Sequence, residues 1–197
     1  MRYTLYATLM IAAVLVVVAP ISAADKTSSG IYLTADDFKN EKLTSEGWGS
    51  DSSHKLQLHD VLDKPYIHVT HGNETQKYDK SEVYGFRDGS GRSYRFVGNK
   101  EYQILEAKEL FIYSVSVDVL DPGQKTRRTD KTYYFSVGAT GEAFPLTIDN
   151  VKRAFPENHK LHDSLDMTFK SDSQLTQYDN FHKMYKVNRL LVASSER

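Results

Sequence analysis

The apolar residues of this chain change their spacing near residue 147, and that change limits the folds open to it. Between residues 55 and 146, apolar and polar side chains alternate in short runs separated by turn residues, which is typical of strands buried on one face. After Thr147 the spacing becomes helical. Strands followed by helices predict an α+β fold. We expect an antiparallel β-sheet meander of about seven to nine strands with hairpins, followed by two or three C-terminal helices.

Two local signals in the strand-rich part are specific. Alternating aromatic runs on either side of Asp88-Gly89 predict a β-hairpin over residues 84–96. Thr34 is followed three residues later by Asp37, so it is expected to cap the start of a short helix. Both predictions depend only on residues close together in the chain.

The C-terminal helices are predicted from caps and apolar stripes. Thr147 is expected to cap a helix over residues 148–155, which Pro156 ends. A second helix carries an apolar face, and a third is expected to begin at Ser171. The second face consists of Leu161, Leu165 and Phe169, and the third stripe consists of Tyr178, Phe181, Tyr185 and Val192.

Residues 1–24 have the layout of a secretory signal peptide. Arg2 supplies a positive charge, and the stretch from Leu5 to Ala19 is almost entirely apolar. Pro20 interrupts this run, which is shorter than a membrane-spanning helix needs, and small residues before position 25 offer a cleavage point. We therefore expect an exported protein, periplasmic or extracellular.

The mature chain is expected to be one globular domain over residues 25–197, mainly β over 25–146 and mainly α over 147–197. The sequence contains no cysteine. Disulfides and lipid attachment at a cleavage-site cysteine are therefore excluded, and the core alone must hold the domain together. We expect a soluble product without stable membrane anchoring once the leader is removed.

The charge balance argues against nucleic-acid partners. The chain has 25 Lys and Arg residues against 26 Asp and Glu residues, a formal net charge of −1. Removing Arg2 with the leader leaves 24 basic residues and a net charge of −2. Non-specific nucleic-acid binding requires a strongly basic face, so no nucleic-acid partner is expected.

The sequence contains only incomplete matches to known catalytic motifs. Ser52-Ser53-His54-Lys55 matches the serine–lysine pattern in letters, but it lies in a polar loop without the companion motifs. Zinc could be bound if two C-terminal helices brought histidines and carboxylates together. Those residues are His159, His162, Asp166, Asp179 and His182. The alternative for this set is an exposed, solvated flank, and the sequence therefore assigns no catalytic, cofactor-binding or metal-binding residue.

Tyrosines and arginines on the predicted strands offer a different kind of site. Aromatic faces beside guanidinium groups bind sugars or peptides, but tyrosines also pack on the half-buried face of a sheet while arginines extend to solvent. The packing interpretation is favoured because tyrosine is common in strands. The residues concerned are Tyr84, Tyr94, Tyr133, Tyr134, Arg87 and Arg95.

Three segments carry a resemblance to a family. They are residues 84–96 (Tyr-Gly-Phe-Arg, then Tyr-Arg-Phe), residues 30–38 (Gly-Ile-Tyr-Leu-Thr, then Asp-Phe) and residues 181–188 (Phe-His-Lys-Met-Tyr-Lys-Val-Asn). Together they resemble uncharacterised small exported proteins of Gram-negative bacteria. The resemblance implies export to a bacterial envelope and carries no assigned activity, catalytic residue or cofactor.

The sequence therefore favours a non-catalytic secreted or periplasmic module that binds a protein, a peptide or a glycan. Two alternatives stay open. One is an exported hydrolase, metal-assisted through the C-terminal histidines. The other is a structural component of the envelope.

Overall fold

A computed structural model describes residues 28–48, 54–58, 64–120 and 127–195, and the predicted leader lies outside these residues. The described chain is α+β, with an eight-stranded antiparallel sheet followed by C-terminal helices, which confirms the predicted fold class. In sheet order, the strands are β11 (Phe144–Pro145), β10 (Arg127–Val137), β9 (Leu110–Leu120), β8 (Lys100–Ala107), β7 (Ser93–Val97), β6 (Gly85–Arg87), β1 (Ser28–Tyr32) and β2 (Thr44–Trp48).

The predicted hairpin over residues 84–96 is present as β6 and β7. The Asp88 carboxylate accepts the N–H groups of Ser90 and Arg92, both at 2.9 Å, and so closes the turn. Gly85 has no room for a side chain, because a Cβ there would lie 1.9 Å from the carbonyl oxygen of Tyr94 on β7. The aromatic alternation and the turn residues therefore act together.

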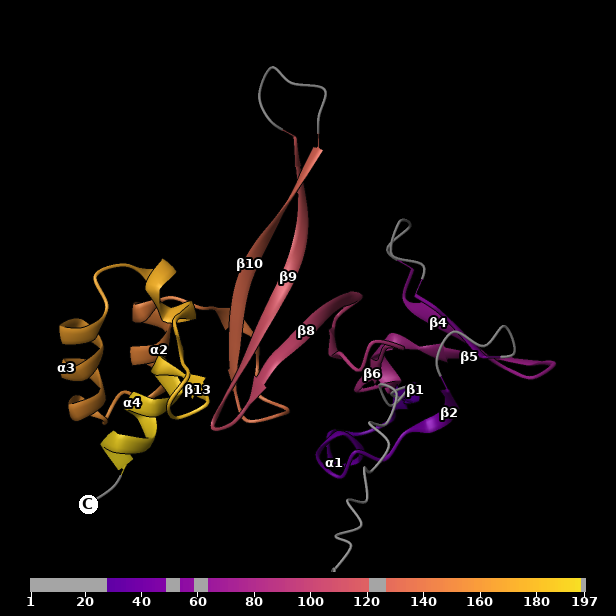
Figure 1. Ribbon diagram of the computed structural model, residues 1–197, viewed down its shortest axis with the longest axis horizontal. Helices are drawn as coiled ribbons and strands as arrows, with labels where there is room; N and C mark the ends of the chain where they lie inside the picture. The colour runs from indigo at the N-terminus through magenta and orange to yellow at the C-terminus, as the bar shows by residue number, and fades with distance from the viewer. Residues whose placement is uncertain (1–27, 49–53, 59–63, 121–126, 196–197) are drawn as a thin grey trace, which may run out of the picture.

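Three helices cover one face of the sheet over β8, β9 and β10 (Figure 1). They are α2 (Ile148–Ala154), capped by Thr147 as predicted, α3 (His159–Thr168) and α4 (Lys186–Ser195). Alternate residues of β9 and the helix stripes meet in one buried cluster. It consists of Leu110, Ile112, Phe135, Leu146, Val151, Leu161, Leu165, Phe169, Leu175, Val187 and Leu191.

The prediction of a helix beginning at Ser171 is wrong. The chain instead forms a short 3₁₀ helix, η3 (Asp172–Thr176), and a hairpin of β12 (Tyr178–Asp179) and β13 (Met184–Tyr185) before α4. The Asp179 carboxylate accepts the N–H groups of Phe181 and His182, so a local turn competes successfully with the helical pattern. Phe181, placed on the predicted stripe, is 89% exposed.

A second, three-stranded sheet packs against strands β1, β6 and β7 of the main sheet, away from the helices. It consists of β3 (His54–Gln57), β4 (Tyr66–His71) and β5 (Glu74–Asp79), and it is followed by a 3₁₀ helix, η2 (Lys80–Glu82). Its apolar residues meet those of β1, β6 and β7 in a cluster of their own. The buried members are Ile31, Ile67, Val69, Val83, Phe86 and Phe96.

The short helix α1 (Ala35–Lys39) begins at Thr34, as predicted. The Thr34 side chain accepts the N–H of Asp37, and the Asp37 carboxylate accepts the N–H of Thr34, both at 3.0 Å, which forms a complete capping box. This orients Phe38 towards a third cluster, on the face of β9 opposite the helices. The buried members of that cluster are Tyr102, Phe111, Tyr113 and Ala139.

Candidate functional site: an open strand edge beside an aromatic groove

Strand β8 changes its pairing partner at Gln103. Its first half pairs with β7 up to Tyr94↔Gln103, and its second half pairs with β9 from Gln103↔Ser114 to Ala107↔Phe111. The register shifts between Ile104 and Glu106, as at a β-bulge. On the side away from β9, residues 104–107 have no strand partner in the described chain.

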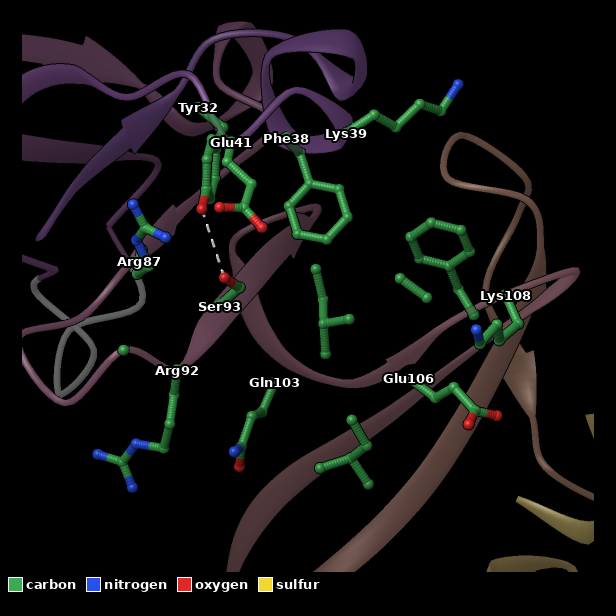
Figure 2. A pocket seen from close by; sticks show the side chains of 15 residues that line it. Tyr32, Phe38, Lys39, Glu41, Arg87, Arg92, Ser93, Gln103, Glu106 and Lys108 are labelled. Carbon is green, nitrogen blue, oxygen red and sulfur yellow. Dashed lines mark hydrogen bonds between the residues drawn. The ribbon is translucent and has the colours of Figure 1, made fainter. Parts of the chain in front are cut away.

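A cavity of about 730 Å³ lies along this unpaired edge. Figure 2 shows its lining side chains, which come from β8 on one side and from β1, α1 and the β6–β7 hairpin on the other. A volume of this size is within the range of ligand-binding clefts. The residues that line it are Tyr32, Phe38, Lys39, Glu41, Arg87, Gly91, Arg92, Ser93, Gln103, Ile104, Leu105, Glu106, Ala107, Lys108 and Phe111; we call it the β8 groove.

Three aromatic side chains give the β8 groove an apolar wall. Phe38 meets Tyr32 edge to face at 5.4 Å between ring centroids and lies 6.0 Å from the Phe111 ring. Tyr32 is 1% and Phe111 6% exposed, so packing fixes both rings before any ligand arrives. The Tyr32 hydroxyl lies 3.5 Å from the Ser93 hydroxyl on the same side of the groove.

Cationic side chains predominate at the groove. Arg87 is held by hydrogen bonds to the carbonyl and the hydroxyl of Ser28, at 3.0 and 3.2 Å. Arg92 pairs with the Asp88 carboxylate at 2.9 Å. The Lys108 ammonium has no ion-pair or hydrogen-bond partner among the described residues. Lys39 also lines the groove, so the lining offers positive charge to a ligand.

The two glutamates of the lining differ in their availability. Glu106 accepts hydrogen bonds from the backbone N–H of Tyr185 and from the Asn188 side chain, so its carboxylate is held against α4 and β13. Glu41, after α1, lies beside Tyr32 in the groove (Figure 2). Glu41 is therefore the carboxylate of the lining that a ligand would meet.

Tyr84 and Tyr94, predicted as ligand-facing or packing residues, both pack in the sheet and lie outside the β8 groove. Tyr94 stacks on Phe86 at 4.6 Å, and Tyr84 packs against Phe38 at 5.5 Å. Burial raises the pKa of the Tyr84 hydroxyl well above its ordinary value, and the neighbouring Tyr113 adds to this, so the phenol is neutral. Tyr133 packs against the buried cluster under the helices, which contains Leu110 and Phe135. Tyr134 packs against the cluster on the opposite face of β9, which contains Phe111.

The two arginines of that prediction have different positions. Arg87 lines the β8 groove. Arg95 donates to the hydroxyls of Tyr113, at 3.1 Å, and Ser136, at 3.3 Å. With Tyr84 it also lines a second cavity of about 500 Å³ next to α1 and η2. Of the predicted set, Arg87 lines the β8 groove and Tyr84 and Arg95 line the second cavity, whereas the other three tyrosines line neither of these two cavities.

The histidines proposed as metal ligands are not brought together. Nε2 of His162 lies 2.9 Å from the carbonyl oxygen of Phe155, so this nitrogen carries a hydrogen and is not a free ligand. His159 is its neighbour at 5.9 Å between ring centroids, whereas His182 pairs with Asp179 in the β12–β13 hairpin. Asp166 pairs with Lys152 at 2.6 Å. No group of three or more His, Asp or Glu side chains suited to a metal occurs in the described part of the chain.

The serine–lysine pattern falls partly outside the described residues, which exclude Ser52 and Ser53. His54 and Lys55 begin β3. The His54 ring is buried against Gly47 of β2, where a Cβ would lie 1.9 Å from the imidazole, and neither ring nitrogen has a hydrogen-bond partner among the residues that the structure describes. His54 thus packs between the two sheets.

This packing makes part of the stability pH-dependent. Burial, helped by the nearby His71, lowers the pKa of His54 below its ordinary 6.5. The unfolded chain therefore takes up the proton at higher pH than the folded chain. We expect the free energy of unfolding to be at its full value above pH 6.5 and to fall as the pH drops through the folded pKa of His54. Urea unfolding on both sides of this range measures the loss. His54→Leu should flatten the profile, and an unchanged profile would contradict the assignment.

The groove itself was missed at the level of sequence, although one signal is visible. Ile104 and Leu105 are adjacent apolar residues that interrupt the alternation of β8, as a bulge requires.

The described residues contain no helix with the length and apolar character needed to cross a bilayer.

Comparisons with known proteins add no assignment to this geometry. No protein-family model, curated protein or solved structure matched the chain.

Proposed function

We propose that this chain is a non-catalytic exported binding module whose β8 groove takes an extended segment of polypeptide as an added strand. The observation that carries the proposal is the unpaired edge of residues 104–107, which forms one wall of the 730 Å³ cavity. An unpaired strand edge presents backbone N–H and C=O groups that an extended peptide can satisfy. A glycan would leave that row of directional backbone groups poorly matched.

The lining indicates what such a peptide should contain. In an added strand, successive side chains point to opposite faces, so alternate residues meet different surroundings. The half-buried ring of Phe38, backed by Tyr32 and Phe111, suits an apolar side chain. The cationic side chains, Lys108 above all, suit acidic ones. The preferred ligand is therefore an extended segment in which apolar and acidic residues alternate.

The test uses a synthetic peptide, acetyl-Glu-Val-Glu-Phe-Glu-Val-amide with a fluorescent label, and measures binding by anisotropy. Its lysine counterpart, Lys-Val-Lys-Phe-Lys-Val, is the charge control. Two further probes carry N-methyl groups on alternate amides, one set for each edge of the peptide. Strand addition uses a single edge, so one N-methylated probe should lose binding and the other should keep it. Equal binding of both N-methylated probes, or no binding of the acidic peptide, would overturn the proposal.

A charge reversal in the protein completes this test. Lys108→Glu should weaken binding of the acidic peptide by about fivefold, since an exposed charge contact contributes roughly 1 kcal/mol. Lys55→Glu is the matched control, because Lys55 is also exposed but lies on β3, away from the groove. Equal loss in the two variants would indicate a general charge effect and would contradict recognition in the groove.

A further inference from the structure

The same change of partner in β8 leaves a second unpaired edge, on β9. Strands β9 and β10 pair along their full length, from Leu110↔Val137 to Leu120↔Arg127. Strand β8 pairs with β9 only between Phe111 and Ser114, and a hollow of about 340 Å³ separates its first residues from residues 115–118. Figure 1 shows β9 and β10 projecting beyond β8 as a two-stranded arm.

Both sides of this arm lack a strand partner in the described chain. Strand β11 pairs with β10 only at Tyr134 and Phe135, and Leu146 just after it donates its N–H to the carbonyl of Tyr133, so residues 127–132 have no strand partner on that side among the described residues. Two-stranded ribbons are marginally stable in water without further strands or a covering layer. The arm also exposes 42% of the Val117 side chain. Its geometry therefore favours addition of another strand.

The sequence along the β9 edge is self-complementary. Residues 115–119 read Val-Ser-Val-Asp-Val, symmetric about Val117 in the alternation of apolar and polar side chains. When two copies pair antiparallel about a twofold axis perpendicular to the sheet, each pair of directly opposed residues has its side chains on the same side of the sheet. Side chains alternate along a strand, so this holds only if the axis lies level with a residue and not midway between two residues. An axis at Asp118 would place two carboxylates opposite each other, which is unfavourable.

We propose that two copies of this chain associate through their β9 edges, antiparallel and with the twofold axis at Val117. Val117 then faces Val117 of the second copy, and Val115 faces Val119 of the second copy. Ser116 faces Asp118 of the second copy. The product is a four-stranded sheet, β10-β9-β9-β10, with valines along one face of its centre.

Charges on the arm agree with this register. Lys131 lies opposite Ser116 within the arm, so Lys131, Ser116 and Asp118 of the second copy fall in one row on one face. Neighbouring strands are about 4.8 Å apart, so the lysine can extend over the small serine to that carboxylate. The face that carries the valines also carries Arg128 and Asp130 of β10, which lie opposite Val119 and Val117. These two side chains form an ion pair at 3.1 Å within one arm, so their charges balance each other.

The oligomeric state tests this directly. Sedimentation equilibrium of the protein purified from cells expressing the full chain should show a concentration-dependent dimer. Val117→Lys should abolish it by placing two ammonium groups opposite each other across the axis. Val137→Lys is the matched control, because Val137 is 43% exposed on the same hairpin but lies at its other end. A monomeric wild-type protein, or a dimer that survives Val117→Lys, would overturn the proposal.

A single introduced cysteine tests the register, since the natural chain has none. Opposed residues in antiparallel strands have Cα atoms about 4.5–5.5 Å apart, within the range for a disulfide. Mild oxidation of Val117→Cys should therefore yield a covalent dimer, whereas Val137→Cys should yield none. Equal cross-linking of the two variants would show random collision rather than the proposed interface.

Discussion

Replacing Asn188 by leucine should lower the free energy of unfolding by about 3–5 kcal/mol, because several buried polar groups lose their partner together. Asn188 is fully buried on α4. Its amide oxygen accepts the N–H of Leu110 at 3.0 Å, and its amide nitrogen donates to the carbonyl of Leu110 at 2.9 Å and to the Glu106 carboxylate. Leucine has the same branching and number of side-chain heavy atoms and is no smaller, so the loss cannot come from a cavity. Urea unfolding at neutral pH measures it.

A double-mutant cycle shows whether Glu106 belongs to this unit. Glu106 is 9% exposed, and its carboxylate also accepts the backbone N–H of Tyr185, so in Asn188→Leu it should stay buried with fewer hydrogen bonds. Changing Glu106→Leu as well removes that buried charge, so the double variant should lose less stability than the sum of the two single variants. Strict additivity would mean that the two side chains act independently.

Replacing Lys80 by methionine should cost on the order of 3 kcal/mol, because it breaks an ion pair whose lysine is almost completely buried. The ammonium of Lys80 donates to the Glu101 carboxylate and to the carbonyl of Asn99, both at 2.8 Å, and lies 5.3 Å from the centre of the Phe96 ring. The Lys80 side chain is 1% exposed. Methionine keeps most of the volume and the apolar contacts, so the loss isolates the charge.

The matched control for Lys80→Met is Lys39→Met. Lys39 pairs with Asp36 at 3.4 Å, but these side chains are 58% and 82% exposed. Exposed pairs contribute about 0–1 kcal/mol, so the control should change stability little. Added salt should reduce the difference between the two variants only slightly, because a buried pair is poorly screened. A loss as small for Lys80→Met as for Lys39→Met would contradict a stabilising role for the buried pair.

The features that could be predicted from the sequence are those determined by neighbouring residues. The capping box at Thr34 and Asp37 depends on a spacing of three residues, and the hairpin depends on alternating aromatics around Asp88. Thr147 likewise caps α2 through the N–H of Asn150. Each of these features depends on contacts between residues a few positions apart, so the sequence pattern alone is enough to predict it.

The failures arise where distant or competing interactions decide. Helical spacing predicted a buried Phe181, yet hydrogen bonds to the Asp179 carboxylate close a turn and leave the ring exposed. The β8 groove depends on which strand β8 pairs with on each side of Gln103, and no local pattern specifies pairing partners so far apart in sequence. Its aromatic wall combines Phe38 and Phe111, which only the assembled sheet brings together.

The change of partner at Gln103 also has a consequence for cooperativity. Hydrogen bonds of β8 connect the strands packed around Phe86 with those packed under α3 and α4, and Phe38 meets Phe111 across the same junction. Loss of order on either side turns the corresponding half of β8 into an unsupported edge, which raises the free energy of the other side. One strand thereby transmits unfolding between two hydrophobic clusters that otherwise consist of different residues.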